Sequence, residues 1–152
     1  MIYIMVALKA EAQAFVDKYR LKNYKNDKIS LIISGMGKEN MFRASCQALE
    51  SFTQDDKILN VGICGANKNY EIGEIIDGFE KKITCIDFEV SCGDFEIVDM
   101  ESEGFLEATK GVKNRYVFKV VSDHFEPKTV TKDKAKKLIF DNIDEIMKRV
   151  QR

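Results

Sequence analysis

Short continuous apolar runs, separated by segments with helical spacing, are the feature that most constrains the fold of this chain of 152 residues. Four such runs are IYIMVA at 2–7, LIIS at 31–34, ILNVGICGA at 58–66 and YVFKVVSD at 116–123. A strand that reads as a continuous apolar run is buried on both faces, which is typical of parallel sheets covered by helices. The sequence therefore predicts an α/β fold with three α/β/α layers and a mostly parallel or mixed central sheet.

The segments between these runs complete the expected order of elements. The predicted helices are 10–19, 41–52, 98–110 and 131–150, and two further strands are predicted at 72–76 and 82–88. Apolar side chains three and four residues apart support the helices. No repeat, linker or low-complexity tract interrupts the chain, so we expect a single domain over residues 1–152.

Composition excludes several classes of protein. Lys and Arg number 24 against 25 Asp and Glu, a net charge of −1, so no nucleic acid partner is expected. No apolar run approaches the roughly 20 residues of a membrane span, and the N-terminus has no basic region typical of a secretion signal. We therefore expect no membrane partner and a cytoplasmic location. The four cysteines form no CxxC pair and the single histidine, His124, is distant from them, so neither a metal nor a cofactor is expected.

The ends of the predicted strands are where a ligand site is expected. In open α/β sheets ligands bind beyond the carboxyl ends of the strands. Five segments occupy such positions, namely 8–11, 34–38, 62–67, 87–90 and 122–124. Glycines dominate two of these segments and acidic residues occur in three. The glycines of SGMGKEN (34–40) are equally well explained by a tight turn that needs positive φ.

Residues 97–105, IVDMESEGF, place three carboxylates beside apolar side chains. Unpaired backbone N–H groups and the helix dipole favour acidic residues in the first turn of a helix, so Asp99, Glu101 and Glu103 are consistent with a helix start alone. The spacing by itself leaves that interpretation open.

Five stretches, taken in order, resemble the purine nucleoside phosphorylase and nucleosidase superfamily. They are MVALKAEAQAF, SGMGKEN, NVGICGA, VDMESEGF and VVSDHF. The nearest likeness is to the nucleosidases that cleave methylthioadenosine and S-adenosylhomocysteine, in a shortened form. The Met-Glu element and the Ser-Asp strand end are the most specific part of the resemblance. It implies a phosphorylase/nucleosidase-like fold over the whole chain.

The resemblance also implies roles for individual residues. Glu101 would accept hydrogen bonds from ribose hydroxyls, and Met100 would pack under the sugar. Asp123 would face the purine and help to protonate N7, and Glu11 would polarise the attacking water. Ser122, Gly62 and Gly65 would join the substrate-binding residues. If Glu101 faces a ligand, Asp99 and Glu103 should point away from it, toward solvent or backbone N–H groups, because helix residues two apart differ by about 200°.

These residue types suit the cleavage of an N-glycosidic bond. The reaction passes through an oxocarbenium-like state, which a carboxylate bonded to the sugar hydroxyls stabilises. Protonation of the leaving purine lowers the barrier further. The phosphorylases carry a Gly-rich, Arg-containing loop after the first strand, whereas this chain has VALKAE at 6–11. We therefore expect hydrolysis rather than phosphorolysis.

The chain departs from the family pattern at three places. Ile63 and Cys64 replace a Ser or Thr beside the third-strand glycine. Lys119 replaces an arginine and provides charge without bidentate geometry. Only GFEK (78–81) connects two predicted strands where family members carry a longer segment, and Phe88 is the candidate for the missing base-stacking ring.

Three functions follow from these observations. The first is a purine nucleosidase, a homodimer if a second subunit completes its site. The second is a family-derived domain that binds a purine base or nucleoside, a small molecule, without cleaving it. The third is a flavodoxin-like nucleotide-binding module, which explains the alternation of elements and leaves DMESE and SD unexplained.

Overall fold

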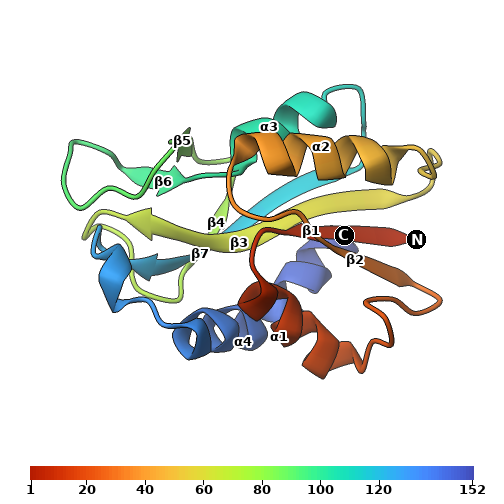
Figure 1. The fold of residues 1–152 in the computed structure, drawn as a ribbon, viewed down its shortest axis with the longest axis horizontal. Coiled ribbons are helices and arrows are strands. Elements are labelled where there is room, and N and C mark those ends of the chain that lie inside the picture. Colours follow the sequence, from red (N-terminus) through yellow and green to blue (C-terminus); the bar gives the residue numbers. More distant parts are fainter.

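The computed structural model describes residues 1–152 and has helices on both faces of a central sheet (Figure 1). The elements follow the order β1 (Ile2–Val6), α1 (Lys9–Tyr19), β2 (Ile29–Ile33), α2 (Lys38–Leu49), β3 (Lys57–Ala66), β4 (Ile75–Asp77), β5 (Thr84–Cys85), β6 (Ile97–Asp99), α3 (Ser102–Ala108), β7 (Arg115–Asp123), a 3-10 turn (Pro127–Thr129) and α4 (Lys132–Val150). None of the helices combines the length and apolar character that crossing a bilayer requires.

The sheet is mixed and mostly parallel, as predicted. Strand β1 pairs in parallel with β2 on one side and β3 on the other, and β7 runs parallel to β3 along its far edge. Strand β4 is antiparallel to β7, and β6 is antiparallel to the end of β3. Strand β5 adds to β6 in parallel. The predicted fold class is therefore confirmed.

Strand β3 extends beyond the end of its neighbour β1, so the sheet is interrupted on that side of β3. Its pairing with β1 ends at Asn60, and its pairing with β6 starts only at Gly65. Strand β7 pairs with β3 on the opposite side along this whole stretch. Residues 61–64 therefore have no strand partner on the side where β1 ends, and their backbone groups must find other partners.

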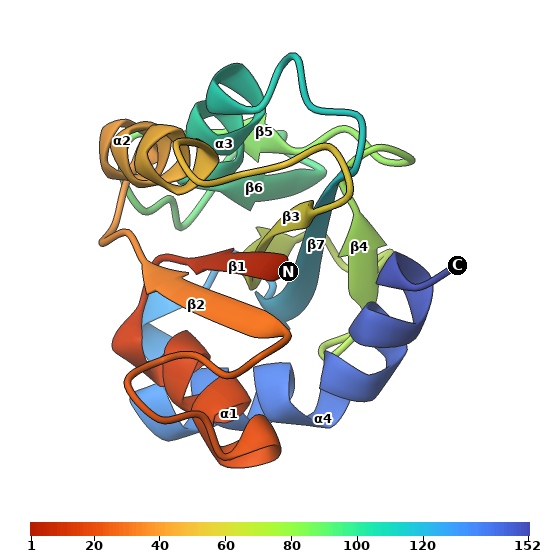
Figure 2. The same cartoon turned by 90° about the vertical axis from the view of Figure 1, so that its right-hand side faces the viewer.

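Two helical layers enclose the sheet (Figure 2). Helices α2 and α3 cover one face, and α1 and α4 cover the other. Alternate residues of β1 pack against the two helical layers. Ile4 and Val6 belong to the hydrophobic cluster with α1 and α4. Met5 packs with Met41 of α2 and Phe105 of α3. All five are fully buried, which explains why the strand shows no polar alternation.

The structure corrects the predicted helix at 98–110. Residues 97–99 form strand β6, and helix α3 begins only at Ser102. The physical reason is tertiary pairing, because Ile97 and Val98 lie opposite Ala66 and Gly65 of β3. A three-residue strand of this kind has too little length to show a period of its own.

Smaller differences concern strand ends. The predicted strand 72–76 is displaced to Ile75–Asp77, because Gly73 has a left-handed φ of 92° that no strand accommodates. The predicted strand 82–88 shrinks to Thr84–Cys85, since its partner β6 is itself only three residues long. Strand β2 begins at Ile29, two residues before the predicted run.

Gly104 allows α3 to lie against the start of α2, and its substitution tests this packing. A Cβ at Gly104 would lie 1.9 Å from the backbone oxygen of Lys38, which cannot move without shifting α2. We expect Gly104→Ala to lower the free energy of unfolding by about 3 kcal/mol or more, as severe overpacking does. Gly111→Ala is the control, because nothing lies within 4 Å of its Cβ position. Urea unfolding of both variants measures the difference, and similar values would contradict this account.

Candidate active site

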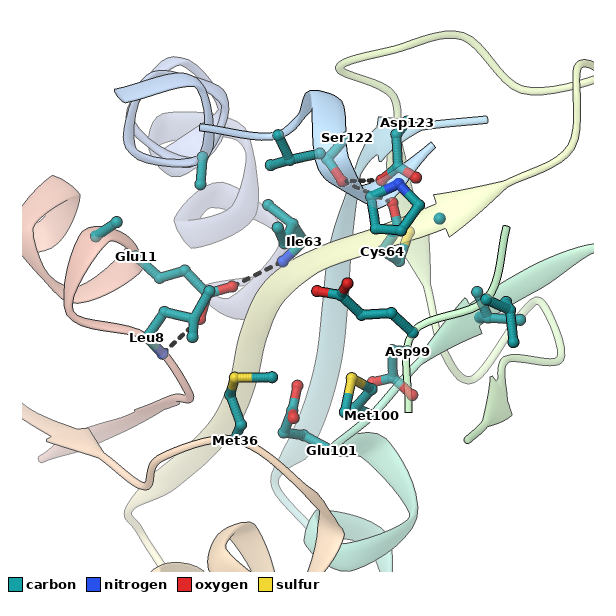
Figure 3. A pocket seen from close by; sticks show the side chains of 18 of the residues that line it. Leu8, Glu11, Met36, Ile63, Cys64, Asp99, Met100, Glu101, Ser122 and Asp123 are labelled. Atoms are coloured by element: carbon teal, nitrogen blue, oxygen red, sulfur yellow. Dashed lines mark hydrogen bonds between the residues drawn. The ribbon is translucent and has the colours of Figure 1, made fainter. Parts of the chain in front are cut away.

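A cavity of about 480 Å³ lies at the carboxyl ends of β1, β3 and β7, beside the interruption in the sheet (Figure 3). This is the position expected for a ligand site in an α/β sheet. Glu11, Glu101 and Asp123 all line it, and they come from α1, the start of α3 and the end of β7. The fold thus brings together three carboxylates that are far apart in the sequence.

Glu11 occupies the gap that β1 leaves beside β3. Its Oε1 accepts hydrogen bonds from the backbone N–H groups of Ala7 at 3.1 Å and Leu8 at 2.9 Å. Its Oε2 accepts from the N–H of Ile63 at 2.9 Å, within the unpaired stretch of β3. Only 2% of Glu11 is exposed, so this carboxylate belongs to the interior although it lies in the first turn of α1.

Burial raises the pKa of Glu11 from 4.5 to about 7, while the ammonium of Lys119 and the N–H groups of Ile63 and Leu8 oppose the rise. Gly62 is part of this arrangement without lining the cavity. A Cβ at Gly62 would lie 2.9 Å from Oε2 of Glu11 and 3.3 Å from Nζ of Lys119. Gly62 therefore provides the space in which the carboxylate and the ammonium lie.

Glu101 is half-buried and lines the cavity. Its Oε2 accepts a hydrogen bond from the backbone N–H of Gly37 at 2.7 Å, which leaves Oε1 without a protein partner. Gly37 has a left-handed φ of 95°, so the turn before α2 presents its N–H to Glu101 in a conformation that favours glycine. Burial raises the pKa of Glu101, and Lys119 and the Gly37 N–H counteract this. Met100 lines the cavity next to it.

Asp99 lies in the interior, which corrects part of the expectation for DMESE. Its Oδ2 lies 3.1 Å from Nζ of Lys119, and both side chains are 1% exposed. Asp99 also accepts hydrogen bonds from the N–H of Ser102 at 2.9 Å and from its hydroxyl at 2.6 Å, so it does cap α3. Glu103, in contrast, is exposed as expected. The three acids of DMESE are therefore not equivalent.

Lys119 is the buried cation of the site. Burial alone would lower the pKa of Lys119, but Asp99, Glu101 and Glu11 together outweigh burial and raise it. The lysine therefore stays charged beneath the carboxylates. An ammonium enclosed by three acidic side chains partly compensates the cost of removing them from water.

Asp123 and Ser122 line the cavity on the side opposite Glu101 (Figure 3). The Ser122 hydroxyl lies 2.6 Å from Oδ1 of Asp123 and 3.2 Å from the carbonyl oxygen of Cys64. Oδ2 of Asp123 accepts from the N–H of Glu126 at 2.8 Å, so the aspartate caps the loop after β7 as well as lining the cavity. Gly65 lines the cavity here, where a Cβ would lie 3.7 Å from Oδ2 of Asp123.

Phe88 does not reach the cavity. Its side chain is 72% exposed, and its neighbours Ile86, Glu89 and Val90 line the cavity instead. In this irregular segment the backbone turns the Phe88 ring outward, so the structure does not support it as a stacking ring.

Phe125 lines the cavity and was missed in the sequence analysis, although it directly follows the SDH segment. Its φ of 62° is rare for a bulky residue and belongs to the turn that Asp123 caps. Met36, from SGMGKEN, also lines the cavity. No group of three or more His, Cys, Asp or Glu side chains is arranged to hold a metal ion.

Asp99→Asn tests the buried ion pair. The substitution leaves the Lys119 ammonium in the interior without its nearest counter-ion, so we expect the free energy of unfolding to fall by about 3–5 kcal/mol. Glu103→Gln, two residues after the cavity residue Glu101, is the exposed control and should change it by less than about 0.5 kcal/mol. Urea unfolding near neutral pH compares the two, and an Asp99→Asn variant as stable as the control would rule out the pair as a stabilising interaction.

The pKa of Glu11 predicts a specific dependence of stability on pH. Between pH 4.5 and about pH 7 the Glu11 carboxyl group is ionised in the unfolded chain and still protonated in the folded chain. The stability that Glu11 contributes is therefore complete below pH 4.5 and is lost as the pH rises through about 7, a fall of about 3 kcal/mol. Glu11→Gln should remove this fall. Unfolding free energies at pH 4.5 and pH 8 measure it in both proteins, and the same pH dependence in both would contradict the assignment.

No protein-family model and no curated protein matches the sequence, whereas solved structures match the fold. A 5′-methylthioadenosine/S-adenosylhomocysteine nucleosidase from Helicobacter pylori, solved with butyl-thio-DADMe-Immucillin-A, is 15% identical with a TM-score of 0.78, over 99% of this chain and 97% of that chain. The nucleosidase of the same description from Neisseria meningitidis, in complex with methylthio-immucillin-A, is 14% identical with a TM-score of 0.72, over 97% and 98%.

Futalosine hydrolase of H. pylori is 15% identical with a TM-score of 0.71, over 95% of this chain and 97% of that chain. The resemblance expected from the sequence is confirmed at the level of the fold. This chain of 152 residues has the fold of the methylthioadenosine/S-adenosylhomocysteine nucleosidases, at low sequence identity.

Proposed function

We propose that residues 1–152 form a single domain that hydrolyses the N-glycosidic bond of a purine nucleoside. One observation carries the proposal: Glu11, Glu101 and Asp123 come from three distant segments and line one cavity at the carboxyl end of the sheet. Their order in the chain matches the nucleosidase pattern. The fold shared with nucleosidases solved with nucleoside analogues supports the same class of substrate.

Each carboxylate has a separate role in the proposed reaction. Glu101 holds the ribose hydroxyls through its free Oε1 and favours positive charge on the ring. Asp123 gives a proton to N7 as the bond between C1′ and the purine breaks. Glu11 accepts a proton from the water that attacks C1′, and a group with a pKa of about 7 is suited to this near neutral pH. One water adds across the bond, and the products are the free purine and the free sugar.

Water rather than phosphate is the proposed nucleophile. The turn after β1 holds Leu8 and Lys9, with neither the glycines nor the arginine of a phosphate loop. Lys119, the cation beneath the carboxylates, is already paired with Asp99. Glu11 also places a carboxylate, which repels phosphate, at the position where the nucleophile would lie.

A second candidate is a domain that binds a nucleoside without cleaving it. Two observations favour it: both oxygens of Asp123 already have protein partners, and Phe88, the expected stacking ring, is exposed and does not line the cavity. A more open cavity excludes water less completely and weakens the effect of its charged groups. Turnover distinguishes the two candidates, since both predict binding.

Asp123→Asn is the sharpest test. Asparagine keeps an oxygen for the Glu126 N–H, so the loop cap should survive, but it cannot deliver the proton to N7. In phosphate-free buffer the wild-type chain should release free purine and free sugar from a purine nucleoside, and Asp123→Asn should slow this about 10²-fold with little change in binding. Chromatography of the released base measures the rate.

The control is Asp55→Asn, an exposed aspartate outside the cavity. Binding without any release of base would favour the second candidate. Formation of a sugar 1-phosphate would show that phosphate, and not water, is the nucleophile. An Asp123→Asn variant as fast as wild type would remove the general-acid role.

A further inference from the structure

The Phe125 ring is a large apolar group that the core does not use. Phe125 is half-buried and lines the cavity. It belongs to none of the three hydrophobic clusters of the core, and it pairs with no other aromatic ring. An aromatic side chain buries about 150–250 Å² when it is fully enclosed, so this ring keeps apolar surface that a ligand could cover.

The backbone at Phe125 is strained, which a ring with no role would not require. Its φ of 62° lies in the left-handed region, which is unfavourable for a bulky side chain. The other non-glycine residues with positive φ, Arg20, Asn23 and Tyr24, are exposed and outside the cavity. Strain of this kind is concentrated at functional sites. A glycine would adopt the Phe125 backbone conformation without strain, yet the chain has a phenyl ring there.

A hydrogen-bonded turn fixes Phe125 relative to Asp123. Oδ2 of Asp123 accepts from the N–H of Glu126 at 2.8 Å, and Phe125 lies inside the turn that this bond closes. Oδ1 of Asp123 is held by the Ser122 hydroxyl at 2.6 Å. The carboxylate and the ring therefore belong to one rigid unit, and a ligand that meets the carboxylate lies within reach of the ring.

Gly65 keeps the space beside this unit free. A Cβ at Gly65 would lie 3.4 Å from Cδ1 of Phe125, 3.3 Å from Cγ2 of Val98 and 3.7 Å from Oδ2 of Asp123. Two apolar side chains and one carboxylate thus surround the same point above the Gly65 backbone. This combination suits a flat heteroaromatic ring, whose faces are apolar and whose edge carries polar nitrogen atoms.

Phe125 is the one aromatic side chain that lines the cavity. Phe88, between β5 and β6, is 72% exposed and does not line it. A stacking ring in this chain would therefore come from the turn after β7, next to Asp123.

We propose that Phe125 is a base-binding residue that stacks on the purine ring and makes the cavity select flat heteroaromatic bases. This rests on the proposed function of the same site. Asp123 meets the edge of the base at N7, and the neighbouring ring covers one of its faces. Stacking of a base on an aromatic side chain depends on the π face of the ring, so an aliphatic side chain of similar size cannot replace it.

The first test uses tryptophan fluorescence. The chain contains no tryptophan, so Phe125→Trp introduces a single reporter at the proposed stacking position. Adenine is the probe because it contains the base without a glycosidic bond and is not consumed. We expect adenine to quench the fluorescence of the Phe125→Trp variant as it stacks on the indole. Phe88→Trp is the matched control and should keep its fluorescence.

The second test measures the Kd of adenine by calorimetry. Phe125→Leu should weaken binding about ten-fold, whereas Phe88→Leu should leave it unchanged. Phe125→Gly separates binding from folding, because glycine accepts the left-handed backbone. We expect it to weaken adenine binding at least as much as Phe125→Leu while it shifts the midpoint of urea unfolding little, since relief of strain offsets the added freedom of the unfolded chain.

The outcomes that would overturn the proposal are distinguishable from failure of the proposed function. If wild type binds adenine and Phe125→Leu binds it equally well, or if adenine leaves the fluorescence of the Phe125→Trp variant unchanged, the stacking role is wrong and the proposed function stands. If Phe88→Leu loses affinity and Phe125→Leu does not, Phe88 is the stacking ring. If wild type binds neither adenine nor adenosine, the proposed function fails and this inference fails with it.

Discussion

The hydrogen bonds of the Glu11 carboxylate are the interaction on which the site depends. Strand β1 ends where β3 continues, and backbone N–H groups that lose a strand partner inside a protein must find another acceptor. The two oxygens of Glu11 accept from Ala7 and Leu8 at the end of β1 and from Ile63 in β3. One side chain therefore starts a helix, joins two strands and presents a carboxylate to the cavity.

Placing that carboxylate in the interior imposes conditions on its surroundings. Gly62 has to lack a side chain, because a Cβ there would lie 2.9 Å from Oε2 of Glu11. A cation has to be close, and Lys119 provides it while pairing with Asp99 at 3.1 Å. Burial still raises the pKa of Glu11 to about 7, so the site keeps a base that titrates near neutral pH at a cost in stability.

The cavity is also asymmetric in charge. Lys9 and Lys132 line it from the starts of α1 and α4, and Glu101 lines it from the residue before α3. The asymmetry follows from the layers, because α1 and α4 cover one face of the sheet while α3, which directly follows Glu101, covers the other (Figure 2).

The sequence alone determined the layers and most of the elements. Strands buried on both faces have to be continuous apolar runs, so β1, β3 and β7 were visible without a structure. The resemblance placed Glu11, Glu101 and Asp123 among the functional candidates. What it missed were short elements such as β6, whose Ile97 and Val98 are strand only because they lie opposite β3.

Only the tertiary structure decided which residues meet. Asp99 looked like one of three acids at a helix start, yet its partner Lys119 lies on β7, and no local pattern encodes that pairing. Phe88 looked like a stacking ring and is turned outward, while Phe125 lines the cavity from a left-handed turn. The physical reason is the same in each case. Local spacing reports which side of an element is buried, whereas a site is made by side chains from distant segments, and their contacts exist only once the sheet has formed.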